Sequence, residues 1–175
     1  MRQIAKALFY EYCDCKEIKE GAFYGINLSA SGSGFLGDAL AFTGFRNSGG
    51  AGEGGVQALV LCGSKSVAFY SYGGLSGGFG SAGGAVMANL GVLDGYGVGT
   101  PTGYTKWFTT TNFGGVVGKG WTIGANGGGF HGTNFRGGPV QGGYVNIAGG
   151  VSSGPGVSFT AGRQYYWLLG VVPAQ

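Results

Sequence analysis

Charged residues are scarce in this chain of 175 residues, where Asp, Glu, Lys and Arg together make up 10%. The ten Lys and Arg residues are spread along the sequence and no three are adjacent, so a nucleic-acid-binding stripe is not expected. Beyond residue 20 the only acidic residues are Asp38, Glu53 and Asp94. Paired carboxylates for acid–base catalysis are therefore not expected either.

Cysteine and histidine are equally sparse. Cys13 and Cys15 form a C-x-C pair, but Cys62 and the only histidine, His131, stand alone, so no second ligand pair completes a metal site. An odd count of three predicts free thiols in a reducing compartment rather than a disulfide framework. We expect no metal and no cofactor.

Long apolar runs are absent as well. No stretch reaches the roughly 18 apolar residues of a transmembrane helix. Residues 1–20 carry charges throughout their apolar part and lack a small-residue cleavage site, so we expect no signal peptide. These features predict synthesis in the cytoplasm, with release by another route or assembly left open, and the final compartment stays unknown.

Glycine is what the chain has in excess, at 43 residues, beside 43% hydrophobic and 14% aromatic residues. Disordered chains combine low hydrophobicity with high charge, and collagen needs a strict three-residue glycine period; neither description applies. The stretch Tyr72–Val92 combines many glycines with Leu75, Phe79 and Val86. We interpret it as a turn-rich start followed by a strand, and the whole chain as all-β.

Alternation with a period of two supports this fold. In residues 22–30, Tyr24, Ile26 and Leu28 share one face while Asn27 and Ser29 share the other, which is typical of a half-buried strand. Further strands are expected at 38–45, 56–63, 66–72, 83–92, 105–113, 116–125, 142–151 and 156–172. Residues 46–55, 94–104 and 126–139 are expected to be loops, the first of them flexible.

Two of these strands carry specific expectations. In 116–125, Gly118, Gly120 and Gly124 fall on one face, where a backbone, ring or ligand could approach closely. In 156–172, alternate residues from Val157 to Val171 share a face, and Gly162 is expected to bend or bulge the strand.

Residues 1–20 show apolar positions at helical spacing and are expected to form one amphipathic helix that ends at Gly21. Residues 21–175 then form a single glycine-rich β domain. About eight to ten strands separated by short connections predict an antiparallel barrel or sandwich with one N-terminal helix.

The matches to catalytic motifs are expected by chance in a chain so rich in glycine and serine, and they lack the structural context that these motifs need. Gly74, Ser76 and Gly78 match G-x-S-x-G, but a strand follows where a nucleophile elbow needs a helix. The G-x-G-x-x-G matches at 50–55 and 78–83 likewise open no helix. We therefore predict a protein that is not an enzyme and has no catalytic residues.

Aromatic residues are the most suggestive feature. Glycine beside exposed aromatic rings makes flat platforms that suit sugars, lipid interfaces or another copy of the chain. The candidate binding residues are Trp107, Trp121, His131 and Arg136.

Two resemblances accompany these patterns. The segments "GGLSGGFGSAGGAVMANLGV", "GGGFHG" and "GPVQGGYVNIAGGVSSGPG" resemble the glycine-rich eight-stranded barrels of the virulence-associated Vap proteins, over about residues 67–156. That resemblance implies a secreted effector acting at membranes. The segment "SFTAGRQYYWLLGVV" is similar to the last strands of jacalin-related lectins, although no acidic residue follows Asp94 to contact a sugar.

The composition thus favours a non-enzymatic β-structured module that self-associates or forms part of a larger assembly. Low charge, abundant apolar residues and little protection of sheet edges support this hypothesis. The alternative is a barrel that binds glycan or membrane through aromatic and glycine-rich loops. The expected partner is therefore another copy of the chain or a glycan or lipid surface, and not nucleic acid.

Overall fold

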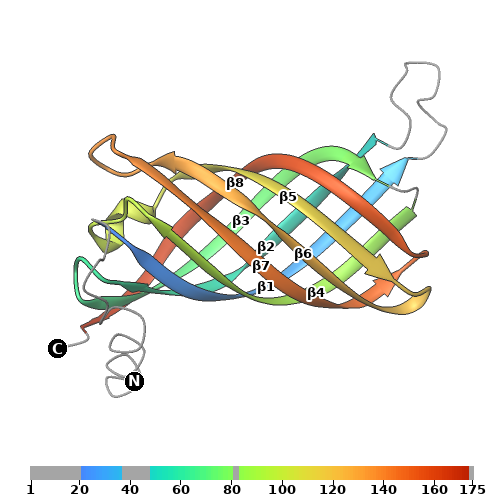
Figure 1. Ribbon diagram of the computed structural model, residues 1–175, viewed down its shortest axis with the longest axis horizontal. Helices are drawn as coiled ribbons and strands as arrows, with labels where there is room; N and C mark the ends of the chain where they lie inside the picture. The colour runs from blue at the N-terminus through green and yellow to red at the C-terminus, as the bar shows by residue number, and fades with distance from the viewer. Residues whose placement is uncertain (1–20, 37–47, 81–82, 174–175) are drawn as a thin grey trace.

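The computed structural model describes residues 21–36, 48–80 and 83–173, which form one closed antiparallel β-barrel (Figure 1). Its strands are β1 (Phe23–Leu36), β2 (Ser48–Leu61), β3 (Ser66–Gly80), β4 (Gly83–Tyr96), β5 (Trp107–Val117), β6 (Gly120–Thr133), β7 (Pro139–Ser152) and β8 (Gly156–Pro173). A 3₁₀ helix, η2 (Pro101–Tyr104), lies between β4 and β5. The barrel alternative of the sequence analysis is confirmed.

The strand order around the barrel is β1-β2-β3-β8-β5-β6-β7-β4. Hence β3, β4 and β7 are each followed in the chain by a strand that is not their neighbour in the sheet. We call the end that carries η2 the η2 end, and the opposite end, where β1 finishes and β4 begins, the distal end (Figure 1). Closure pairs every strand on both sides, so the described barrel has no free sheet edge.

Two predicted elements fall on residues that the structure does not describe. These are the helix at 1–20, which is not confirmed, and the strand at 38–45. The described part of the chain contains no α-helix.

The alternation in β1 is confirmed, but the face that meets solvent is the apolar one. Ile26 and Leu28 are more than half exposed, whereas Asn27 and Ser29 point into the lumen and are at most 6% exposed. β4 and β8 follow the same rule, with Leu90 outward and Asn89 inward on β4. The barrel is therefore inverted relative to a soluble protein over much of its length.

Three predicted irregular segments are instead strand. Residues 48–55 of the expected flexible loop lie in β2, residues 73–80 extend β3, and β6 continues to Thr133. The glycines in these segments pair in register, as Gly50 does with Gly34 and Gly77. Main-chain hydrogen bonds to both neighbours hold these residues, so the low strand propensity of glycine is overridden.

The expected strand 116–125 is a hairpin. β5 ends at Val117 and β6 begins at Gly120, and both Gly118 (φ 119°) and Gly120 (φ 77°) have left-handed backbone that favours glycine. A Cβ at Gly120 would meet nothing within 4 Å, so no close packing occurs there, whereas one at Gly124 would lie 2.6 Å from the Gly115 carbonyl oxygen. The close-packed glycine face is thus wrong for Gly120 and correct for Gly124.

The bulge expected at Gly162 is also misplaced. Gly162 pairs in regular register with Ser76 and Thr110. The only register shift between β3 and β8 lies between Phe69 and Tyr70. Neither neighbour of Gly162 shifts register, so glycine there serves close approach: a Cβ would overlap the Leu75 carbonyl oxygen.

The hydrophobic core occupies the η2 end of the barrel. Tyr104 of η2 reaches across the lumen and is completely buried. Its ring centroid lies 4.8 Å from those of Phe108 and Tyr166, 5.2 Å from that of Tyr70 and 5.4 Å from that of Phe23. These rings, with aliphatic neighbours such as Leu59 and Val140, form the aromatic plug.

Cys62 lies just after β2 and is disulfide-bonded. The prediction of free thiols is therefore wrong for this residue. Cys13 and Cys15 fall outside the described residues.

Candidate functional site

The outer surface of the strands is dominated by large apolar side chains. We call these the apolar belt: Ile26, Leu28, Val56, Leu75, Phe79, Val86, Leu90, Val92, Trp107, Phe113, Val117, Trp121, Ile123, Val145, Ile147, Val151, Val157, Phe159, Trp167, Leu169 and Val171. All eight strands contribute. Soluble monomers rarely expose a contiguous apolar surface of this extent, so the belt indicates a surface that contacts lipid or another protein.

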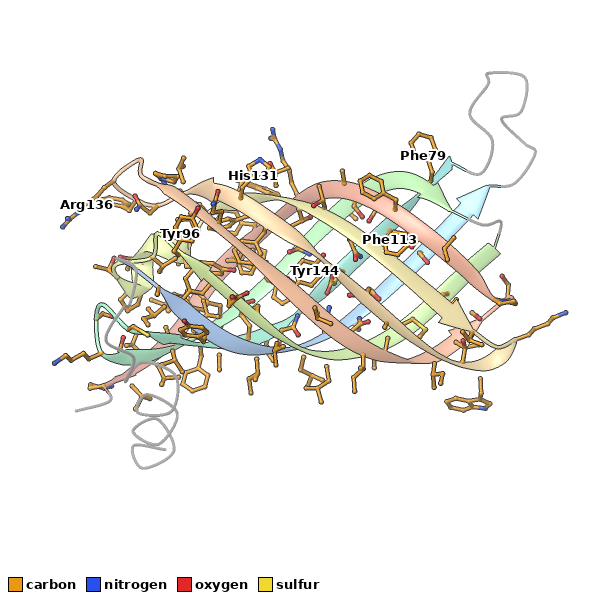
Figure 2. The ribbon with its side chains drawn as sticks, in the orientation of Figure 1. Phe79, Tyr96, Phe113, His131, Arg136 and Tyr144 are labelled. Atoms are coloured by element: carbon orange, nitrogen blue, oxygen red, sulfur yellow. The ribbon has the colours of Figure 1, made fainter. Side chains whose placement is uncertain are left out.

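Acidic, basic and histidine side chains are rare on this outer strand surface. Among the described residues they are Asp94 on β4, His131 on β6 and Arg163 on β8. His131 and Arg163 both pair with Thr109, and Asp94 pairs with Tyr24 close to the start of β1. Figure 2 shows His131 in the same half of the barrel as Tyr96 and Arg136. The belt toward the distal end is free of described charges.

The lumen presents the opposite chemistry. Its inward polar side chains, drawn from all eight strands, include Asn27, Ser29, Glu53, Gln57, Tyr72, Asn89, Thr110, Asn126, Asn146, Thr160 and Gln164. Most are small or medium-sized, and many inward positions are glycine. A Cβ at Gly74 or Gly128 would overlap a carbonyl oxygen of the neighbouring strand. Small inward residues are needed because the strands curve tightly around a narrow lumen.

A hydrogen-bond relay runs along the lumen wall. Asn146 Nδ2 donates to Asn126 Oδ1 at 2.7 Å, and Asn126 Nδ2 donates to Asn89 Oδ1 at 3.1 Å. Asn89 Nδ2 donates to Ser29 Oγ at 3.2 Å, and Ser29 Oγ donates to Glu53 Oε1 at 2.8 Å. Every donor in this chain points toward the Glu53 carboxylate.

Glu53 is the acceptor at the end of this relay. Its Oε1 also accepts from the Tyr72 hydroxyl at 3.1 Å, and its Oε2 accepts from Gln164 Nε2 at 3.2 Å. The described lysines and arginines lie in turns, in loops or on the outer face, so none of them neutralises this carboxylate from within the lumen. Glu53 is the one inward-facing charge on the described strands.

The aromatic plug closes the lumen at the η2 end. Tyr72 stacks on Tyr166 of the plug, with 5.1 Å between ring centroids, and the Tyr166 hydroxyl donates to Gln164 Oε1 at 2.7 Å. The Tyr104 hydroxyl lies in this layer beside Gln57 and Tyr166 without a hydrogen bond of normal geometry. Burial raises the pKa of Tyr104 well above its ordinary value. The lumen is therefore closed at the η2 end.

The structure does not gather the four predicted binding residues into one site. Trp107 begins β5, and its ring contacts Tyr165, 5.3 Å away between centroids. His131 lies on the outside of neighbouring β6, whereas Arg136 lies in the loop 134–138 beyond it. Trp121, at 87% exposure, is at the distal end.

Sequence reasoning misses Glu53 and the lumen asparagines. Glu53 falls in the expected flexible loop, and nothing in the motifs singles out Asn89, Asn126 or Asn146. The available signal is their alternation with aliphatic neighbours, as in Leu90 beside Asn89. Alternation by itself does not say which of the two faces turns inward.

Within the described residues, no group of three or more His, Cys, Asp or Glu side chains could hold a metal ion. No helix in the same part of the chain is long and apolar enough to cross a membrane. The chain shows no significant match to a protein-family model, a curated protein or a solved structure. The geometry of the belt and the lumen is therefore what points to a function.

Proposed function

We propose that the protein is a membrane-inserted β-barrel whose apolar belt contacts lipid acyl chains. The observation that carries this proposal is the inverted polarity of the wall, with aliphatic residues outward and Asn, Ser, Thr and Gln inward. Barrels that cross bilayers alternate in this way, because lipid solvates the outer face and backbone groups are satisfied between strands. This choice develops the membrane-binding alternative of the sequence analysis.

The dimensions of the strands are adequate for this role. A tilted strand needs about 9–11 residues to cross a bilayer. β1, β4, β6 and β7 each have 14 residues. Figure 1 shows all of the strands strongly inclined to the long axis of the barrel, as closure requires.

Aromatic residues lie near both ends of the outer surface. Tyr24, Tyr96 and Trp107 are the second residue of β1, the last of β4 and the first of β5, all at the η2 end. Trp121 is the second residue of β6 at the distal end. Tyrosine and tryptophan concentrate at the two interfaces of a bilayer, where one side of the ring is apolar and the other is hydrated.

Closure of the lumen at the η2 end argues against a pore-forming barrel. The aromatic plug fills the η2 end, so the barrel supplies no continuous aqueous path in the state described. We therefore expect insertion without leakage of a vesicle-entrapped dye. The disulfide at Cys62 agrees with an η2 end that faces an oxidising compartment.

Flotation with liposomes tests the proposal through a matched pair of variants. Ile147 lies within the apolar belt opposite Leu90 and is 67% exposed, and Phe135 lies outside the belt in a loop at 77% exposure. Arg at a lipid-facing position near the bilayer centre costs about 2–4 kcal/mol. Ile147→Arg should lose flotation, and Phe135→Arg should float like the parent.

Equal flotation of Ile147→Arg and the parent would count against a lipid-facing belt. So would a parent protein that stays monomeric in detergent-free buffer and does not associate with liposomes. Circular dichroism of both variants in detergent establishes that the barrel has folded before flotation is compared.

Self-association remains the second candidate, because another copy could also cover the belt. Gly32 and Gly34 of β1 face outward beside Gly50 and Gly52 of β2, and a Cβ added at either β1 glycine would meet nothing within 4 Å. This smooth area would let two barrels approach closely. A defined oligomer in detergent-free buffer, measured by light scattering, with no liposome flotation would favour assembly over insertion.

A further inference from the structure

The lumen contains a cavity between the Glu53 layer and the distal end. It has a volume of about 120 Å³, and its lining includes Glu53, Asn112, Tyr144 and Gln164. A smaller cavity of about 20 Å³ adjoins it and shares Glu53, Tyr144 and Gln164. A single water needs roughly 10–15 Å³ of such volume, so the larger cavity can hold a small organic molecule.

The polar atoms without partners are mostly acceptors. Asn27 Oδ1, Asn112 Oδ1 and Asn146 Oδ1 have no hydrogen-bond partner, against a single donor of that kind on the lumen amides, Gln57 Nε2. Asn27 and Gln57 line the smaller cavity and are 6% and 5% exposed. Asn112 lines the larger cavity, whereas Asn146 lines neither. Buried polar groups of native proteins are nearly always satisfied, so the free Asn112 Oδ1 beside the larger cavity indicates a site for a guest.

The relay also has a direction. Asn146, Asn126, Asn89 and Ser29 each donate one hydrogen bond in the direction of Glu53, so the relay converges on the carboxylate. The cavity wall also includes Ser and Thr hydroxyls, which can donate or accept, but its one charged group on the described strands is the Glu53 carboxylate. An anion would be repelled by that carboxylate.

We propose that the lumen binds a small organic cation that carries several N–H donors, of the guanidinium or primary ammonium class. Its charge faces the Glu53 carboxylate, an N–H group donates to the free Oδ1 of Asn112, and Tyr144 forms part of the wall of the same cavity. Charge-assisted hydrogen bonds to a carboxylate are the strong ones, and guanidinium matches carboxylate geometry. This inference concerns the lumen and does not depend on insertion of the barrel.

Isothermal titration of the full chain in detergent tests the proposal with three small probes. Methylguanidinium has charge and donors, N-methylurea has similar shape and donors without charge, and tetramethylammonium has charge without donors. Saturable binding of methylguanidinium is expected, with each of the other probes at least about tenfold weaker, since hydrogen bonds to charged groups are worth more than neutral ones.

Variants locate the binding. Glu53→Gln keeps the shape and removes the charge, and should weaken methylguanidinium binding by about tenfold or more. Asn112→Ala should weaken it without touching the Glu53 relay, and Thr111→Ala, one residue away on the outer face, should leave it unchanged. Should Glu53→Gln fail to fold by circular dichroism, Asn112→Ala against Thr111→Ala decides alone.

Three results would overturn the proposal. They are the absence of saturable methylguanidinium binding, equal binding of N-methylurea, and unchanged binding by a folded Glu53→Gln or Asn112→Ala variant. Liposome flotation of the parent is scored separately, so loss of lumen binding and loss of membrane insertion remain distinguishable.

Discussion

The most direct challenge to this structure is removal of the side chain at the centre of the aromatic plug. Tyr104 is fully buried and contacts Phe23, Tyr70, Phe108, Phe130 and Tyr166 through its ring. Truncating a buried aromatic residue to alanine costs about 3–5 kcal/mol, because transfer free energy is lost and a cavity is left. Tyr104→Ala should therefore lower the free energy of unfolding by about that amount.

Tyr104→Phe separates the ring from its hydroxyl. The hydroxyl has no hydrogen-bond partner of normal geometry, so its removal relieves an unsatisfied buried group. We expect the free energy of unfolding to be unchanged or raised by up to about 1 kcal/mol. Denaturant unfolding in detergent, followed by near-ultraviolet circular dichroism, measures both variants against the parent.

The same residue gives a pH dependence. Burial raises the pKa of Tyr104 in the folded state above its ordinary value of 10.0, so folding favours the neutral phenol. This contribution is fully present below pH 10 and is lost as pH rises beyond it. Tyr104→Phe should lose less stability than the parent in that range.

Two results would refute this account of the plug. A loss below about 1 kcal/mol for Tyr104→Ala would mean that η2 does not fill the lumen as described. A loss above about 1 kcal/mol for Tyr104→Phe would mean that the hydroxyl has a partner.

The remaining predictions concern backbone and covalent constraints. Gly128→Ala places a Cβ on the Thr111 carbonyl oxygen and should destabilise by at least about 1–3 kcal/mol, while Gly149→Ala, with nothing within 4 Å, should be neutral in the same thermal melt. Gly120→Val should cost about 1–2 kcal/mol through its positive φ, and Gly120→Asn clearly less; equal losses would point to packing instead. Cys62→Ser should lower the free energy of unfolding by about 2–4 kcal/mol in non-reducing buffer. In reducing buffer, where the parent also lacks the disulfide, the variant and the parent should be equally stable.

The sequence predicted the alternating faces of the strands better than it predicted the glycine-rich segments, the strand order or which face turns inward. Period-two alternation identified the two faces of β1 and the outward face of β8 correctly, because side chains on a strand alternate whatever lies on either side. It failed where glycine replaced the pattern. The segment from Gly49 to Gly55 is expected to be a loop, although each of these residues pairs with both β1 and β3.

The order of the strands in the barrel could not be predicted from the sequence, for a different reason. Consecutive strands usually pair, yet β3 passes to β4, which lies on the far side of β2 and β1. Only the long-range pairs, such as Gly73 with Tyr165, determine that arrangement. No local pattern in a single sequence encodes these pairs.

Which face turns inward could have been inferred from side-chain size. Alternation alone is symmetric, so it fits an apolar core inside a soluble barrel and an apolar surface outside a membrane barrel equally well. The two faces of β1 and β4 differ in volume, however, with Ile26 and Leu90 on one face and Ser29 and Gly91 on the other. Outside the aromatic plug, a lumen bounded by eight tightly curved strands has little room for large side chains, and a Cβ at Gly91 would already overlap Asn146 and the Val145 carbonyl oxygen. The low charge of the chain, which by itself suggests assembly, fits the same arrangement. An outer face made of large apolar side chains leaves few positions for charged ones.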